Sequence, residues 1–243
     1  LIHALTNAVR TGKQVTVVLE LRARFDEEAN LEWKAQLEEA GVKVHIGVPN
    51  MKVHAKICSI RRKEGTGFRY YGFISTGNLN EKTATLYGDH CLLTSNRAIL
   101  ADINRIFLYL ENPKTRIGLL KGCKKLIVSP AGMRKTILSY IDREIKNVNA
   151  ERKASIILKL NSLSDPQLIE KLDAAARAGV EVKLIIRGIC CLVTENKKFK
   201  IPIQAVSIVD EYLEHARVMI FYNDGKEKIF ISSADWMLRN IDH

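Results

Sequence analysis

The sequence has no long apolar run and few aromatic residues. No segment approaches the roughly 18 uncharged apolar residues that a membrane-spanning helix needs, and no signal peptide precedes the first helical pattern. We therefore expect a soluble protein. Phe, Trp and Tyr make up only 7% of the 243 residues. No RNP-like or helix–turn–helix motif places them among basic residues, so nucleic acid is not the expected partner.

An initiator methionine is also absent, because the sequence opens on Leu1 and stops at His243 without an obvious terminal element. We interpret the chain as a fragment of a longer protein.

Cysteine occurs five times, an odd number, and never with CxxC spacing. We expect reduced, mostly buried thiols and no zinc site. The cysteines are Cys58, Cys91, Cys123, Cys190 and Cys191.

Acidic residues are outnumbered, since 38 Lys and Arg against 27 Asp and Glu give a formal net charge of +11. Such an excess indicates an anionic partner or a basic binding cleft, although a solvated basic surface would give the same count. The run Arg61-Arg62-Lys63 lies between two strand-like runs, and we interpret it as an exposed hairpin shoulder. The charge predicts a polyanion without naming it.

A short motif occurs twice in this basic chain. Val53-His54-Ala55-Lys56 matches Glu214-His215-Ala216-Arg217, and each copy is followed by an apolar strand-like run and then a small polar turn. Residues i and i+2 of a strand point to the same face, so each copy is expected to set an imidazole beside a cation.

The repeat extends upstream of the two histidines. Residues 14–21 and 154–160 are similar strand-like runs, and each precedes a helical pattern that starts at an Asp and ends at an Ala-Gly-Val sequence. Asp26 and Asp165 are the predicted N-caps, and Gly41 and Gly179 the predicted C′ residues. Four matching segments in the same order indicate an internal duplication. The predicted core face of the first helix is Ala29, Trp33, Leu37 and Ala40.

The duplication predicts two α/β domains, each with helices packed over a mixed sheet. The expected joint lies near residues 111–115, which contain Pro113. We assign residues 1–117 to the first domain and residues 118–243 to the second. In the second copy, Asp235 is expected to pair with Arg239 four residues later.

The paired histidines favour phosphoryl chemistry. Adjacent cations lower the pKa of an imidazole, so it stays neutral and nucleophilic near pH 7. The same cations, Lys56 and Arg217, would stabilise charge on a phosphoryl group during transfer. We therefore interpret His54 and His215 as catalytic, and the other histidines as structural.

The duplicated His-x-Lys or His-x-Arg is similar to the phospholipase D superfamily, whose motif continues to an Asp five residues after the Lys. Here that position is Arg61 in the first copy and Tyr222 in the second. The sequence thus lacks the carboxylate that tunes histidine in those hydrolases, which argues against phosphodiester cleavage. The fold class remains two tandem phospholipase-D-like α/β domains related by internal duplication.

Longer stretches resemble the bacterial polyphosphate kinases, specifically their two C-terminal, phospholipase-D-like catalytic domains. The resemblance spans nearly the whole chain, and its most specific segments are residues 17–30, 53–56, 76–84 and 232–242. It implies reversible transfer of the ATP γ-phosphate onto inorganic polyphosphate, with Mg²⁺, through a phosphohistidine. On this resemblance the first domain is the phosphohistidine domain, and the chain is part of a larger enzyme of polyphosphate biosynthesis.

The resemblance also implies roles for individual residues. His54 matches the phosphorylated nucleophile, and His215 matches a second essential histidine near the nucleotide phosphates. Tyr87 and Arg187 match nucleotide-binding positions, and Arg24 matches a magnesium-associated position. A guanidinium has no lone pair to offer a metal, so we expect Arg24 to meet Mg²⁺ through a shared phosphate. Lys56 and Arg217 would clamp phosphate, with Asn78 as a hydrogen-bonding neighbour.

Two alternatives stay open at this point: a phospholipase-D-like phosphodiesterase, and a non-catalytic module that binds polyanions. The family resemblance further implies ATP, ADP and polyphosphate as partners, a homo-oligomer, and a cytoplasmic location, in some members at the inner face of the membrane. From the residues alone, Arg187 gains independent support, because it follows an apolar strand-like run and α/β sheets bind ligands at strand ends.

Overall fold

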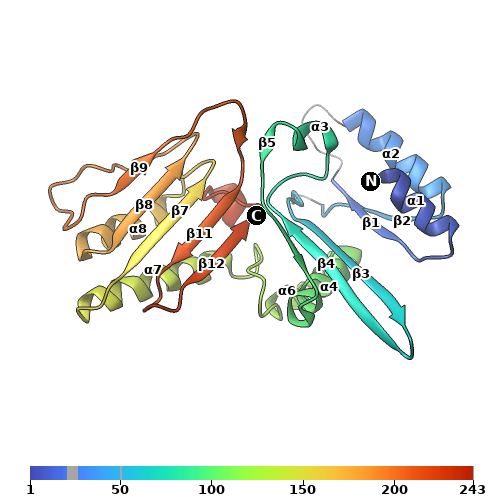
Figure 1. Ribbon diagram of the computed structural model, residues 1–243, viewed down its shortest axis with the longest axis horizontal. Helices are drawn as coiled ribbons and strands as arrows, with labels where there is room; N and C mark the ends of the chain where they lie inside the picture. The colour runs from blue at the N-terminus through green and yellow to red at the C-terminus, as the bar shows by residue number, and fades with distance from the viewer. Residues whose placement is uncertain (21–26, 50, 243) are drawn as a thin grey trace. The chain divides into compact units, whose positions relative to one another are not determined.

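A computed structural model describes residues 1–20, 27–49 and 51–242, and it has a mixed α/β architecture (Figure 1). The chain divides into two compact units. The first contains residues 1–55 and 101–123, and the second contains residues 56–100 and 124–243. The division at residue 117 stays a prediction. Arg24 and the expected N-cap Asp26 lie outside the described residues.

The first unit is built around a short β-α-β segment. Strands β1 and β2 pair in parallel, with Thr16 opposite Lys43 and Leu19 opposite Ile46, and helix α2 connects them. Its elements, with α4 shared between the units, are α1 (Ile2–Arg10), β1 (Thr16–Leu19), α2 (Glu27–Glu39), β2 (Lys43–Ile46), α4 (Arg97–Glu111), α5 (Pro113–Arg116) and α6 (Gly118–Lys121).

The predicted core face of α2 is only partly correct. Leu37 is fully buried and Ala40 is half-buried, whereas Trp33 is 39% exposed. The Ala29 side chain lies outside the described part of the structure. Helical spacing places these positions on one side of the helix, but it does not determine how far neighbouring elements cover each of them. Gly41 has a φ of 86° and occupies the predicted C′ position, where a left-handed backbone ends the helix.

The second unit contains a three-stranded sheet in the order β3-β4-β6, a five-stranded sheet in the order β12-β11-β7-β8-β9, and a two-residue ladder of β5 with β10. Its elements are β3 (Lys56–Glu64), β4 (Gly67–Ser75), α3 (Glu81–Ala84), β5 (Tyr87–Gly88), β6 (Cys91–Thr94), α7 (Met133–Asn149), β7 (Ser155–Leu160), α8 (Pro166–Ala178), β8 (Glu181–Ile186), β9 (Gln204–Val206), β10 (Leu213–Glu214), β11 (Arg217–Phe221), β12 (Lys228–Ser232) and α9 (Leu238–Ile241).

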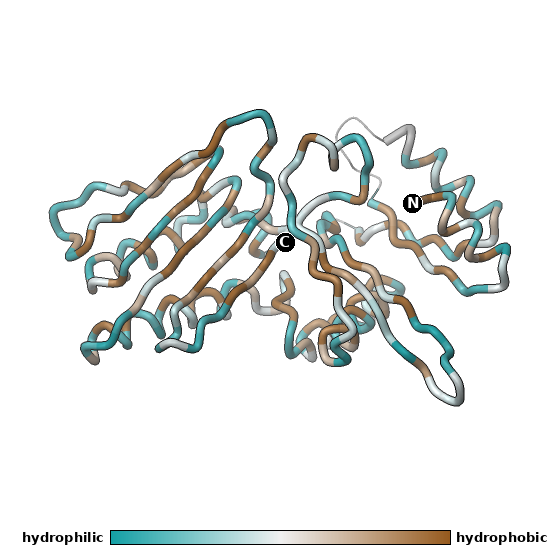
Figure 2. Tube along the Cα trace, in the orientation of Figure 1, coloured by the Kyte–Doolittle hydropathy of each residue, from teal (hydrophilic) through white to brown (hydrophobic). Residues whose placement is uncertain are grey.

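The five-stranded sheet carries the main hydrophobic core. Every second residue of β7 and β8 is buried, which is the two-residue period of a strand, and Figure 2 shows both strands as strongly hydrophobic. Helices α7 and α8 pack on this sheet (Figure 1). Burying each Leu or Ile side chain contributes about 1.5–3 kcal/mol. The buried stripe of α8 is Leu168, Leu172, Ala175 and Ala176.

Helix α8 begins and ends as its sequence predicts. The Asp165 carboxylate accepts a hydrogen bond from the Leu168 N–H at 3.0 Å, which satisfies a backbone donor that the helix itself leaves open. Pro166 occupies the first turn, where its missing N–H costs nothing. Gly179 ends the helix with a φ of 107°, a conformation that glycine adopts without steric cost.

The duplication is visible in matching local structure. Each copy contains a parallel β-α-β segment, β1-α2-β2 or β7-α8-β8, followed by an antiparallel hairpin. In the hairpins Lys56 lies opposite Ser75, and Arg217 lies opposite Ser232. The hairpins differ in length, because β3 and β4 have nine residues each and β11 and β12 have five.

The five thiols are free, as expected, but the prediction that most of them are buried is wrong. Cys91, Cys190 and Cys191 are exposed, and Cys58 and Cys123 are half-buried. Cys190 and Cys191 follow the end of β8, so an apolar run in the sequence continues past the covered part of the strand. Among the described residues, no helix is both long and apolar enough to cross a membrane.

Candidate functional site

Both His-x-Lys/Arg motifs lie in loops that lead into a hairpin strand, and the histidines themselves precede the strands. In the first motif the Val53 N–H donates to Glu20 Oε2 at 2.9 Å. In the second, Lys159 Nζ donates to the Ala216 carbonyl at 3.1 Å and pairs with Glu214 at 3.0 Å. Glu20 and Lys159 hold matching positions in the repeat, so in both copies a charged residue near the end of the first strand anchors the histidine loop.

His215 is joined to a carboxylate that comes from the first half of the chain. Its Nδ1 lies 2.9 Å from Asp89 Oδ1 and 3.0 Å from Asp89 Oδ2. The Nδ1–H donates to this carboxylate, which assigns the proton to Nδ1 and leaves a lone pair on Nε2. The absence of an Asp at position 222 therefore does not deprive His215 of a carboxylate, and that sequence-based inference is wrong for this histidine.

The backbone brings His215 and Asp89 together through β5 and β10. These strands pair in parallel, with Leu213 opposite Tyr87 and Glu214 opposite Gly88. The Gly88 carbonyl then accepts hydrogen bonds from the N–H groups of His215 and Ala216, at 3.1 and 2.9 Å. This ladder, with two residues from each strand, thus fixes the position of the His215 imidazole relative to the Asp89 carboxylate.

The Asp89 carboxylate is itself held by the turn after β4. The Thr76 hydroxyl is fully buried and donates to Asp89 Oδ1 at 2.6 Å. Gly77 packs so closely that a Cβ at this position would overlap the Asp89 carboxylate. The turn Ser75-Thr76-Gly77 therefore holds the Asp89 carboxylate in place, and residue 77 must be glycine because a Cβ does not fit there.

The other ring nitrogen of His215 faces a guanidinium. Arg217 Nη1 donates to His215 Nε2 at 3.1 Å, and Arg217 Nη2 donates to Asp235 Oδ2 at 2.9 Å. Arg217 is only 4% exposed, so its charge requires this carboxylate. The predicted pairing of Asp235 with Arg239 is wrong: Asp235 points toward the sheet, where it meets Arg217.

These neighbours set the charge of the site. Burial lowers the pKa of the His215 imidazole, and the Arg217 charge lowers it further, while the hydrogen bond to Asp89 opposes both. His215 is therefore neutral at pH 7. Burial acts to raise the pKa of Asp235, but the hydrogen bond and charge of Arg217, together with the backbone N–H groups of Asn161 and Ser162, outweigh burial and hold that pKa below its usual value. Arg217 and Asp235 thus form a charged pair beside a neutral imidazole.

Asn161 connects this pair to a second arginine. Its Oδ1 accepts a hydrogen bond from Arg187 Nε at 2.5 Å, and its backbone N–H donates to Asp235 Oδ1 at 2.8 Å. Arg187 directly follows β8, the strand-end position that the sequence predicts. The Tyr87 ring lies 5.0 Å from the His215 ring, centre to centre. Tyr87, Arg187, His215 and Arg217 therefore belong to one side-chain cluster.

The remaining predicted site residues are placed as follows. His54 is half-buried in the loop before β3, Lys56 is the first residue of β3, and Asn78 is exposed in the turn after β4. Sequence reasoning missed Asp89, Thr76 and Asn161. A signal existed for Asp89, because it stands two residues after Tyr87, a predicted site residue. The structure shows that Asp89, and not the exposed His90 that follows it, meets His215.

Within residues 1–20, 27–49 and 51–242, no three His, Cys, Asp or Glu side chains gather closely enough to hold a metal ion. Arg24, the magnesium-associated position, lies outside those ranges.

Comparison with known families covers nearly the whole chain. Residues 1–116 match the family "Polyphosphate kinase C-terminal domain 1", and residues 126–243 match "Polyphosphate kinase C-terminal domain 2". These two families stand in the same order as the two copies of the repeat.

Individual relatives agree with the family matches. The chain is 49% identical to a polyphosphate kinase of Vibrio vulnificus and 46% identical to that of Escherichia coli, in both cases over its whole length. It covers 34% and 35% of those proteins, and so spans about a third of the curated relatives it matches. A crystal structure of polyphosphate kinase from Porphyromonas gingivalis superposes with a TM-score of 0.84 at 40% identity, covering 97% of this chain and 38% of that one.

Proposed function

Because this chain belongs to the polyphosphate kinase family, we propose that it carries the phosphoryl-transfer site of an enzyme that moves the γ-phosphate of ATP reversibly onto inorganic polyphosphate. The transfer proceeds through a phosphohistidine. The chain corresponds to about a third of its relatives, and we propose that the rest of the full-length protein completes the adenine contact.

His54 is the proposed nucleophile. In the first step a lone pair on its imidazole attacks the γ-phosphorus, the P–N bond forms, and the P–O bond to the β-phosphate breaks so that ADP leaves with the electron pair. In the second step a terminal oxygen of polyphosphate attacks the same phosphorus. The new P–O bond forms as the P–N bond breaks, which restores the neutral imidazole and lengthens the polymer by one phosphate.

The arrangement around His215 is the observation that supports this proposal most directly. A neutral imidazole, oriented by Asp89, presents its Nε2 beside the guanidinium of Arg217. A phosphate oxygen that enters here would accept hydrogen bonds from Arg217 and, with one added proton, from His215. Charge-assisted hydrogen bonds are the strong ones, and held in place they stabilise the charge of a transferring phosphoryl group.

The other residues have supporting roles in the proposal. Arg187 is partly exposed and hydrogen-bonded through Nε, so the rest of its guanidinium is oriented to bind nucleotide phosphates. Tyr87 would contact the nucleotide next to His215, and Lys56 and Asn78 would bind phosphate oxygens. Mg²⁺ would enter the site with ATP, because proteins usually hold this ion through one or two carboxylates together with substrate phosphates.

The phosphodiesterase alternative is weakened by the family matches. The missing Asp at position 222 no longer argues against it, since Asp89 supplies a carboxylate to His215. The two chemistries differ in the attacking group that resolves the intermediate, which is polyphosphate in the kinase and water in a hydrolase. The whole-chain similarity to polyphosphate kinases favours the first.

Labelling of the full-length enzyme tests the proposal. After incubation with γ-labelled ATP and Mg²⁺, we expect protein-bound label that is acid-labile and base-stable, as a phosphoramidate is. The His54→Ala variant should acquire none. His3→Ala serves as the matched control, because His3 is exposed on α1, and it should label normally. Normal labelling of His54→Ala would rule out the assigned nucleophile, and phosphodiester cleavage without label would point to the hydrolase.

Assembly and location belong to the same proposal. We propose that the full-length enzyme is a homo-oligomer, as the family resemblance implies, and that it works in the cytoplasm with peripheral attachment to the inner face of the membrane. Light scattering and membrane fractionation of the full-length enzyme test these two properties.

A further inference from the structure

The hairpin of the first repeat is longer than its counterpart. Ile60 lies opposite Tyr71 and Phe221 lies opposite Lys228, at matching positions of the two hairpins. Between these pairs, the first copy has residues 61–70 and the second has only residues 222–227. We call residues 61–70 the hairpin extension. Strand β6 pairs with β4 only from Gly72 to Ser75, so the extension is a two-stranded ribbon.

This ribbon is hydrophilic and strongly basic (Figure 2). It contains four cations, Arg61, Arg62, Lys63 and Arg69, and one acid, Glu64, which give a net charge of +3. The matching turn of the second copy has Lys226 against Asp224 and Glu227, a net charge of −1. Basic charge is thus a property of the extension and not of the repeat.

Two cations of the extension, Arg62 and Arg69, are only partly neutralised within it. Arg62 lies directly opposite Arg69, and like charges in such a pair are destabilising. Both side chains are 71% exposed, and they share the single carboxylate of Glu64 at 3.7 and 3.2 Å. Charge on an edge strand can also prevent aggregation, but a single Lys would serve that purpose. Because Arg62 and Arg69 share only the Glu64 carboxylate, their guanidinium groups can together bind an additional anion.

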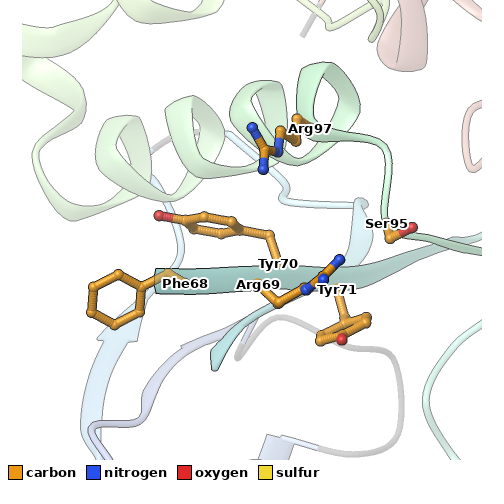
Figure 3. A pocket seen from close by; sticks show the side chains of 6 residues that line it. All are labelled: Phe68, Arg69, Tyr70, Tyr71, Ser95 and Arg97. Carbon is orange, nitrogen blue, oxygen red and sulfur yellow. The ribbon is translucent and has the colours of Figure 1, made fainter. Parts of the chain in front are cut away.

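Aromatic rings in the extension are engaged with its polar groups. The Arg61 guanidinium lies over the Phe68 ring, 4.9 Å from its centre, and the Tyr71 hydroxyl donates to Glu64 at 3.1 Å. Figure 3 shows Tyr70 on the side of β4 that faces Arg97 of α4, with Tyr71 on the other side. Arg69 and Arg97 line a cavity of about 130 Å³ with these tyrosines.

We propose that the hairpin extension and Arg97 form an accessory binding surface for the inorganic polyphosphate chain, separate from the cluster around His215. This inference rests on the proposed function, since it names the substrate of that reaction as the ligand. The surface supplies five cations from β3, β4 and α4. It binds phosphate units of a chain that extends from the reacting end, so it acts on long chains and not on short ones.

Polyphosphate fits these residues better than single-stranded nucleic acid. Nucleic acid would need free ring faces on which bases can stack, and Arg61 covers one face of Phe68 at 4.9 Å from the ring centre. Polyphosphate has charge and no rings, so it needs only the guanidinium groups, which stacking on aromatics holds in place.

Binding and synthesis measurements on the full-length enzyme test this surface. The variant is Arg62→Glu with Arg69→Glu. The matched control is Lys197→Glu with Lys198→Glu, which makes the same change in net charge at two exposed lysines elsewhere in the second unit. A second design replaces residues 61–70 with the sequence of residues 222–227, a turn that already closes the same hairpin in the other repeat. Affinity is measured without ATP, for long-chain polyphosphate and for tripolyphosphate.

We expect the Arg62/Arg69 variant and the shortened hairpin to bind long-chain polyphosphate about tenfold more weakly and with a shallower salt dependence. Tripolyphosphate affinity and phosphohistidine formation from ATP should stay unchanged, as should every property of the control. Unchanged long-chain affinity in both hairpin variants would overturn the proposal, and so would an equal loss in the control. A loss confined to single-stranded DNA or RNA would assign the surface to nucleic acid instead. Absence of phosphohistidine in the wild type would reject the proposed function separately.

Discussion

Asp89 and His215 lie 126 residues apart in the chain, yet the carboxylate of the first accepts the Nδ1–H of the second at 2.9 Å. Asp89 belongs to the first copy of the repeat and His215 to the second. The imidazole–carboxylate pair at His215 therefore joins the two copies of the repeat. The pair exists because β5 and β10 meet in a two-residue ladder.

Replacing Asp89 with Asn tests what this pair contributes. The pKa of His215 should fall further below its ordinary value, because Asp89 is the group that opposes the lowering by burial and Arg217. The ring would also lose the partner that fixes its orientation, and we expect kcat of the full-length enzyme to drop about 100-fold. Histidine NMR titration measures the pKa. Asp224→Asn, at an exposed turn, is the control; an unchanged His215 pKa in Asp89→Asn would contradict the assignment.

Gly77→Ala tests the close packing of residue 77 against the Asp89 carboxylate. The added methyl would overlap the carboxylate, so Asp89 must move away from His215 and Thr76. We expect a loss of activity like that of Asp89→Asn, together with a loss of about 1–3 kcal/mol in the free energy of unfolding from overpacking. Gly67→Ala is the control, because nothing lies within 4 Å of a Cβ there. Activity at the wild-type level in Gly77→Ala would show that the Asp89 carboxylate can be displaced without loss of function.

Arg134 is expected to be the main ionic support of the second unit. It pairs with the fully buried Asp165 at 2.7 Å and with Asp242 at 2.6 Å. Arg134→Met leaves Asp165 without its cation, and breaking such a pair costs about 3–5 kcal/mol. Denaturant unfolding measures the loss. Arg152→Met, which removes an exposed pair with Asp224, should cost less than about 1 kcal/mol.

The same pair gives a pH dependence with a defined sign. The hydrogen bond from Arg134 holds the pKa of Asp165 below its usual value. The contribution is thus complete above the pKa of an unfolded Asp, about 3.9, and is lost as pH falls through the lower folded value. The difference in stability between wild type and Arg134→Met should shrink under acid. A constant difference across this range would mean that Asp165 is not the partner that matters.

Glu144 should give the opposite dependence of stability on pH. It is fully buried on α7 and accepts the Asn223 N–H at 2.7 Å, and burial raises its pKa. Because its folded pKa lies above the unfolded value of about 4.3, the wild type loses stability as pH rises from that value through the folded pKa. Glu144→Gln should therefore gain stability relative to wild type over the same range. Glu227→Gln, at an exposed position, should show no such trend in denaturant unfolding.

Much of the local structure could be predicted from the residues. Asp165 and Gly179 bound a helix because a side-chain acceptor and a left-handed glycine satisfy its ends, wherever that helix lies. Alternating burial in β7 and β8 follows from the two-residue period of a strand. Periodicity was less reliable where the neighbouring element decides burial, as at Trp33, which shares a helix face with Leu37 but remains exposed.

The sequence by itself determined the order of the repeat, the helix ends, the strand pattern and the family. The exposed basic hairpin at residues 61–63 was also predicted correctly. Only the tertiary structure decided that Asp89 contacts His215 and that Asp235 meets Arg217 instead of Arg239. The physical reason is the separation along the sequence over which each kind of interaction acts. Caps and periodicity depend on residues a few positions apart, whereas these ion pairs and hydrogen bonds form between side chains that only the folded backbone brings within 3 Å or so of each other.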